Sequence, residues 1–164
     1  MSTLFVDEIR PKASGGQIAI KDVPAFYAFN NAAQTLTANV WTKVNLQDTL
    51  FDTTDDFNAS SSRFVAPLSG IYSFTTALNF STESSAGGYN YARVLKNGSV
   101  PYYTFGMRLS SQVINHDTQI VGSVLLPLNA NEYVEMGAYQ QVASGSPGLT
   151  NGRCYFTGHL VGAT

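Results

Sequence analysis

The stretch RFVAPLSGIYSFTTALNF, residues 63–80, holds the clearest strand pattern in the chain. After Gly70, four of the five even positions carry large apolar side chains, namely Tyr72, Phe74, Leu78 and Phe80. The odd positions after Ile71 are small or polar, namely Ser73, Thr75, Ala77 and Asn79. This alternation is typical of a β-strand that buries one face. We therefore expect a central strand that follows a turn at Pro67–Gly70 and points its even side chains into a core.

The length and composition of the chain indicate one loop-rich β-domain. Its 164 residues are enough to bury a core without metal or disulfide help, and the single Cys154 cannot form a disulfide within the chain. Charged residues make up 12% of the sequence, against ~25% in an average globular protein. The net charge of −2 and the scattered Lys and Arg residues argue against a nucleic-acid partner. No apolar run approaches the ~20 residues that span a bilayer, so we expect no membrane partner.

Short strand candidates recur from Pro24 onward, separated by turn sequences. They cover residues 25–30, 40–46, 89–95, 102–107, 119–128, 132–140 and 153–161. Lys96-Asn97-Gly98 predicts a two-residue type I′ hairpin, because Asn-Gly tolerates the positive φ angles that this turn requires. Asn129-Ala130-Asn131 predicts a second hairpin. No stretch sustains helical periodicity, so the pattern as a whole predicts an all-β sandwich of antiparallel strands.

Alternation within the strands assigns a set of side chains to the core. These are Phe26, Trp41, Phe64, Tyr72, Phe74, Leu78, Phe80, Val134, Met136, Phe156 and Leu160. The opposite faces carry tyrosines, which are common at protein interfaces. Tyr133, Tyr139 and Tyr155 are therefore candidate subunit contacts of a dimer or trimer. The alternative is that they are scattered surface residues.

Residues 1–23 differ from the rest, and we expect an extended leader in front of one domain, residues 24–164. The leader contains two short alternating segments, which could add as strands to another surface. Their candidate anchor residues are Leu4, Val6, Ile9, Ile18 and Ile20. The alternative is a frayed terminus. The beginning of the sequence lacks the basic and apolar pattern of a signal peptide.

The sequence contains no motif typical of an enzyme, and we expect neither catalysis nor a cofactor. His116 and Asp117 are neighbours, whose side chains would point to opposite faces of a strand. Residues 144–148, SGSPG, lack the strand-to-helix context of a nucleophile turn. Asp52, Asp55 and Asp56 form the one acidic cluster that could bind calcium. Their spacing does not match an EF-hand loop, so we favour the alternative that they cap turns.

Several short motifs, in order along residues 24–161, resemble the C1q globular-head family, which is related in fold to tumour necrosis factor. They are Ala25-Phe26-Tyr27-Ala28, Trp41-Thr42-Lys43-Val44, Phe51-Asp52, residues 64–74, Lys96-Asn97-Gly98, residues 121–128, Val134-Glu135-Met136 and residues 156–161. The resemblance implies a ten-stranded jelly roll that assembles as a homotrimer. Unlike the animal members of this family, the sequence shows no collagen repeat and no secretion signal ahead of the domain.

The segment VDEIRPKASGGQIAI, residues 6–20, is similar to N-terminal segments of bacteriophage tail-fibre and virion proteins, where C1q-like domains also occur. This likeness implies a phage virion structural protein, displayed on the particle surface and docked to a capsid or tail protein by its leader. The expected roles are capsid decoration, a head fibre or a short tail-fibre module. The alternative is an adhesin domain that binds a host receptor or glycan, with Tyr89, Tyr91, Tyr102 and Tyr103 as its candidate ligand surface. A secreted bacterial or animal trimer is a third interpretation.

Overall fold

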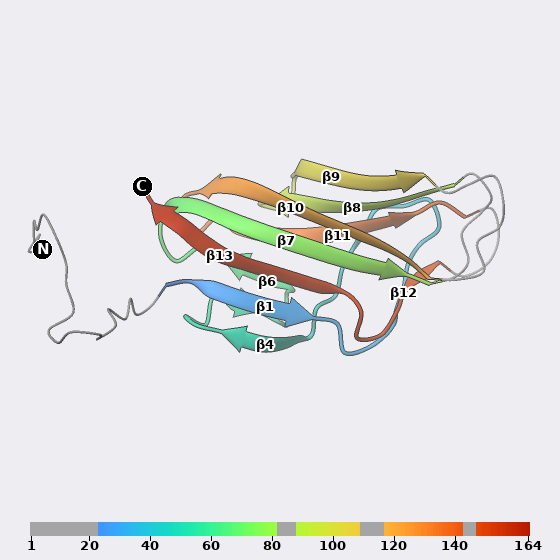
Figure 1. The fold of residues 1–164 in the computed structure, drawn as a ribbon, viewed down its shortest axis with the longest axis horizontal. Helices are drawn as coiled ribbons and strands as arrows, with labels where there is room; N and C mark the ends of the chain where they lie inside the picture. Colours follow the sequence, from blue (N-terminus) through green and yellow to red (C-terminus); the bar gives the residue numbers. More distant parts are fainter. Residues whose placement is uncertain (1–22, 82–87, 109–116, 143–146) are drawn as a thin grey trace, which may run out of the picture.

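The structure, a computed structural model, describes residues 23–81, 88–108, 117–142 and 147–164. These residues form thirteen β-strands in two antiparallel sheets and no helix (Figure 1). One sheet, called the β7 sheet, contains β1 (Ala25–Phe29), β2 (Gln34–Thr35), β4 (Asp48–Asp52), β7 (Gly70–Phe80), β10 (Thr118–Leu128), β12 (Gly148–Leu149) and β13 (Tyr155–Ala163). The other, called the β11 sheet, contains β3 (Thr42–Lys43), β5 (Phe57–Asn58), β6 (Arg63–Val65), β8 (Tyr89–Lys96), β9 (Val100–Arg108) and β11 (Tyr133–Gln140).

Strand β7 lies in the middle of its sheet, as its alternation predicts. It pairs with β10 along one edge and with β13 along the other. Its large even side chains are fully buried. The Tyr72 hydroxyl donates a 2.8 Å hydrogen bond to the Leu68 carbonyl, which ties the strand to the bend at residues 67–69.

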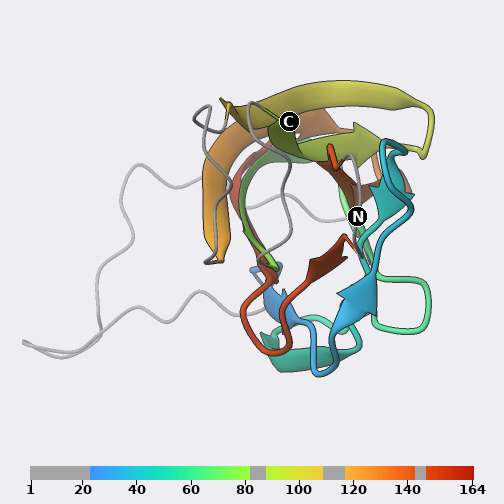
Figure 2. The ribbon, with the colours of Figure 1, turned by 90° about the vertical axis from the view of Figure 1, so that its right-hand side faces the viewer.

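The two sheets face one another and enclose an aromatic core (Figure 2). The ring of Phe26 lies at its centre, stacked on Phe57 at 5.1 Å and on Phe64 at 4.9 Å. Phe74 stacks on Phe156 at 5.4 Å. Most of the core residues that alternation assigns are buried here, namely Phe26, Phe64, Tyr72, Phe74, Leu78, Phe80, Val134, Met136 and Phe156.

Two residues assigned to the core differ from the rest. Leu160 is only half-buried and packs against the edge of the core. The assignment of Trp41 was wrong, because the core positions of its segment are Val44 and Leu46. Trp41 is an odd-numbered position, whereas Val44 and Leu46 are even-numbered. Its side chain is half-buried among aromatic side chains of the β11 sheet.

The two predicted hairpins need correction. Asn97 and Gly98 have φ angles of 52° and 71°, as a type I′ turn requires, but Lys96 pairs with Val100, so the loop has three residues rather than two. The segment after β10 is not a hairpin. Strand β10 pairs within the β7 sheet and β11 within the β11 sheet, so residues 129–132 carry the chain from one sheet to the other.

Candidate functional site

The outer face of the β7 sheet carries several exposed large apolar side chains. Its large side chains, here called the apolar face, are Tyr27, Phe51, Ile71, Val121, Leu125 and Tyr155. Leu125 is 61% exposed and Val121 is 56% exposed. Both pair with odd-numbered residues of β7, whose side chains point away from the core. Tyr27 and Tyr155 stack at 5.2 Å, which adds an aromatic pair to this face. Exposed apolar side chains gathered on one face of a sheet are typical of a protein contact.

The three tyrosines proposed as subunit contacts do not share a surface. Tyr155 belongs to the apolar face, opposite Ala77 in the ladder. Tyr133 and Tyr139 lie on β11, in the other sheet. The Arg63 guanidinium covers the Tyr133 ring at 4.2 Å. Of the three, only Tyr155 is therefore placed to take part in a contact through the apolar face.

Aromatic side chains line a cleft of about 430 Å³ on the outer side of the β11 sheet. This aromatic cleft is lined by Trp41, Tyr89, Tyr91, Thr104, Tyr139 and Gln141. Tyr91 and Tyr139 are direct partners across the β8–β11 ladder, with ring centroids 5.9 Å apart. Trp41 lies 5.5 Å from the Tyr139 ring and 6.2 Å from the Tyr91 ring. Tyr89 stacks on Tyr91 at 5.7 Å.

Two glycines and an arginine shape this cleft. A Cβ at Gly106 would lie 2.3 Å from the Tyr91 ring, so the missing side chain lets that ring lie flat across β9. A Cβ at Gly137 would lie 2.9 Å from Arg93 Nε. The Arg93 side chain passes over this glycine and places its guanidinium 4.2 Å from the centre of the Trp41 ring. Both contacts hold the rings in place before any ligand binds.

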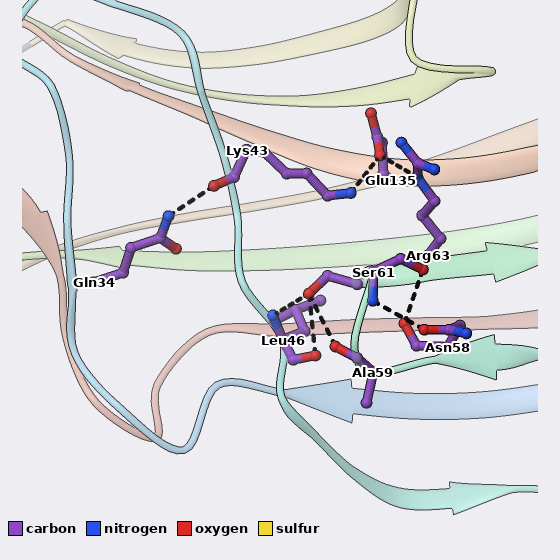
Figure 3. Close-up of polar contacts among 9 residues, drawn as sticks. Gln34, Lys43, Leu46, Asn58, Ala59, Ser61, Arg63 and Glu135 are labelled. Atoms are coloured by element: carbon purple, nitrogen blue, oxygen red, sulfur yellow. Dashed lines mark hydrogen bonds and ion pairs between the residues drawn. The ribbon is translucent and has the colours of Figure 1, made fainter.

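A buried carboxylate lies on the same sheet. Glu135 has 8% side-chain exposure, and its Oε2 accepts from Lys43 Nζ at 2.7 Å and from Arg63 Nε at 2.8 Å. Figure 3 shows the two cationic side chains pointing toward this carboxylate from different strands. Burial raises the pKa of Glu135, but the bonds and charges of Lys43 and Arg63 outweigh burial and hold it below its usual value. We interpret this cluster as structural, because the one carboxylate is already paired with two cations of neighbouring strands.

The candidate calcium residues are engaged within a turn. The Asp52 carboxylate accepts from the backbone N–H of Phe57 at 2.7 Å. Asp56 accepts from the Thr54 hydroxyl, and burial raises its pKa. Asp55 has a φ of 58°. Among the residues that the structure describes, no group of three or more His, Cys, Asp or Glu side chains could hold a metal ion, and the contacts of Asp52 and Asp56 agree with the alternative that these residues cap turns.

Other sequence-based candidates lie partly outside the described residues. The anchor residues Leu4, Val6, Ile9, Ile18 and Ile20 lie outside them, as does His116. Tyr102 and Tyr103 belong to β9, but their side chains also lie outside the description. Asp117 accepts hydrogen bonds from Thr150 and Arg153. Burial raises the pKa of Cys154 to about 11, which disfavours the reactive thiolate.

Four residues of the cleft were missed as ligand-surface candidates. Trp41 was assigned to the core and Tyr139 to a subunit contact, while Thr104 and Gln141 were not singled out. The run Tyr89-x-Tyr91 indicates an aromatic strand face and was the one sequence signal of the cleft. It does not indicate which strands pair with this one, so it does not identify the other residues of the cleft.

Comparison with known protein families matches the C1q domain over residues 25–161. Among solved structures, the chain is similar to the globular domain of zebrafish complement 1qA protein, with a TM-score of 0.65 and 20% identity over 86% of this chain and 99% of that one. It is also similar to Eiger TNF from S. frugiperda, with a TM-score of 0.65 and 8% identity over 87% of this chain and 94% of that one. Murine APRIL at pH 5.0 gives a TM-score of 0.64 and 8% identity over 85% of this chain and 100% of that one.

A search of curated protein sequences found no match. At these identities, the likeness to solved structures shows the fold alone, and it confirms the predicted C1q/TNF-like jelly roll. None of the matches indicates an enzyme family.

Proposed function

The chain belongs to the C1q domain family, and on that premise we propose that it is a homotrimeric structural protein displayed on the surface of a bacteriophage virion. Domains of the C1q/TNF type form homotrimers. The observation that carries self-association for this chain is its apolar face, which leaves large aliphatic and aromatic side chains in water when the protein is alone. Packing copies through this face removes that surface from water, which stabilises the assembly.

The virion assignment is supported by the sequence. The segment at residues 6–20 is similar to leaders of phage tail-fibre and virion proteins, and the charged fraction of 12% is low. Leu4, Val6, Ile9, Ile18 and Ile20 are the proposed anchor to a capsid or tail protein. Capsid decoration, a head fibre and a short tail-fibre module are the roles that this arrangement would serve.

Two measurements test this proposal. The full chain should have a mass in solution near three times 17.7 kDa by light scattering. Leu125→Asp should produce monomers, because a carboxylate cannot be desolvated in an apolar contact without a large cost. Val40→Asp, which also replaces an exposed apolar residue but lies outside the apolar face, should remain trimeric. A monomeric wild-type chain would overturn the proposed assembly.

The second measurement concerns the anchor. Purified phage particles should contain the full chain, and deletion of residues 1–22 should abolish its incorporation. Incorporation of the truncated chain would show that the anchor assignment is wrong. Absence of the full chain from particles would overturn the virion assignment itself.

The aromatic cleft favours a second candidate function, attachment to a host-cell surface. It lies on the sheet opposite the apolar face, so a trimer packed through that face leaves it open. Incubation of the full-length protein with host cells tests this function, because a protein with a decorating role alone should not bind them.

A further inference from the structure

We propose that the aromatic cleft binds a neutral pyranose ring, as part of a surface glycan or as a free glycoside. This inference rests on the second candidate function and names its ligand class. It depends on the lining of the cleft, its charge and its rigidity.

The lining offers flat apolar surfaces of the right kind. The rings of Trp41, Tyr91 and Tyr139 come from three separate segments and lie with centroids 5.5 to 6.2 Å apart. All three side chains are half-buried, so each ring is held by its neighbours but keeps part of its surface open. One face of a pyranose carries mainly C–H groups, whose slight positive charge matches the negative face of an aromatic ring. Burying this face also removes apolar surface from water.

The edge of the cleft offers hydrogen-bonding groups for the sugar hydroxyls. Thr104 and Gln141 line it together with three tyrosines. A hydroxyl can both donate and accept, and the Gln141 side chain carries a carbonyl oxygen and an NH₂ group. Apolar walls with a few polar groups are typical of small-molecule sites, and this mixture suits a ligand with one apolar face and a polar rim.

The charges around the cleft favour a neutral ligand over a cationic one. An aromatic cage can also bind a quaternary ammonium group, but the Arg93 guanidinium already covers the Trp41 ring at 4.2 Å. Its positive charge repels a second cation. The residues that line the cleft include no carboxylate, and the nearby Glu135 carboxylate is bound by Lys43 and Arg63.

The rings are fixed before a ligand arrives. Tyr91 and Tyr139 are held by adjacent backbone strands, and Gly106 and Gly137 give room for Tyr91 and Arg93 to lie flat. A site that is ordered in advance loses less conformational entropy on binding. The cleft can therefore bind a sugar without first ordering its aromatic rings.

The test uses Trp41, the single tryptophan of the chain, as a reporter inside the cleft. The full-length protein is titrated with methyl glycosides of glucose, galactose, mannose and N-acetylglucosamine, and its tryptophan emission and the saturation-transfer NMR signal of the sugar are recorded. We expect at least one glycoside to shift the emission in a saturable way. Tyr139→Ala should weaken its binding by about tenfold or more.

Matched variants separate the cleft from the rest of the sheet. Tyr133→Ala changes the same residue type on the same strand outside the cleft and should bind as wild type. Gln141→Ala tests the polar edge if Tyr139→Ala does not fold, and it should also weaken binding. Saturable binding lost in these cleft variants supports the proposal. It is overturned if none of the four glycosides binds, if choline binds instead, or if the cleft variants bind as wild type.

Cell binding distinguishes this proposal from the function on which it rests. Glycoside binding without host-cell binding supports the site but overturns the attachment function. Host-cell binding that Gln141→Ala and Tyr139→Ala leave unchanged, combined with no glycoside binding by the wild type, overturns the site, while the attachment function stands.

Discussion

Glu135 shows how a single side chain depends on the charges beside it. It is buried on the outer side of its sheet, beneath Lys43 and Arg63. A carboxylate left in this place without cations would raise the free energy of the fold, because burial disfavours charge. The two bonds reverse that effect and lower its pKa.

This arrangement predicts a pH-dependent contribution to stability. A carboxylate with a lower pKa in the folded state stabilises the fold above its unfolded pKa of about 4.3 and loses this contribution as pH falls through the folded pKa. Glu135→Gln should therefore lower the free energy of unfolding by about 1–2 kcal/mol at pH 7, and the difference from wild type should disappear in acid. Urea denaturation at a series of pH values measures it, with the exposed Asp55→Asn as control. A difference that is equally large in acid would contradict the assigned role.

At the scale of elements, β13 passes close to the core at one residue. A Cβ at Gly158 would lie 2.5 Å from Phe74 Cδ1 and 2.8 Å from Phe26 Cε1. Both rings are fully buried and contact other aromatic rings of the core. At residue 158, the strand can therefore lie this close to the two rings only without a side chain.

Gly158→Ala should lower the free energy of unfolding by about 1–3 kcal/mol, the usual cost of overpacking a core. Gly162→Ala is the matched control on the same strand, because a Cβ there would meet nothing within 4 Å. Denaturant unfolding of both variants provides the comparison. Equal stabilities would mean that the core around Phe74 is looser than these distances indicate.

The elements also show why the fold could be predicted and the cleft could not. The alternation of β7 is a local property, because neighbouring side chains on a strand point to opposite faces. The positive φ angles at Asn97 and Gly98 also follow from the residues themselves. The pairing of Tyr91 with Tyr139 is a tertiary property, and no local pattern states it. The turn after Leu128 has the same residue types as a hairpin, yet it connects two sheets.

At the scale of the whole molecule, the two sheets have outer faces of different chemistry. The β7 sheet presents the apolar face, which no other part of the described residues covers. The β11 sheet presents the Glu135 cluster and the aromatic cleft. Because the core separates the two faces, a trimer packed through the first would carry three clefts on its outside.

This separation predicts that assembly changes avidity but not the affinity of one cleft. Leu125→Asp should leave the dissociation constant for a free methyl glycoside unchanged, because Leu125 is remote from the cleft on the opposite sheet. Its apparent affinity for a flexible polymer that carries many copies of the same glycoside should fall by about 10²-fold or more, because a monomer cannot engage several sugars at once. Surface plasmon resonance with the polymer and fluorescence titration with the free glycoside measure the two quantities.

Asn151→Asp, an exposed substitution outside both faces, adds the same charge and should change neither quantity. If Leu125→Asp is monomeric and still binds the polymer as tightly as wild type, the clefts of the trimer do not act together. If it weakens binding of the free glycoside, the two faces are coupled through the core.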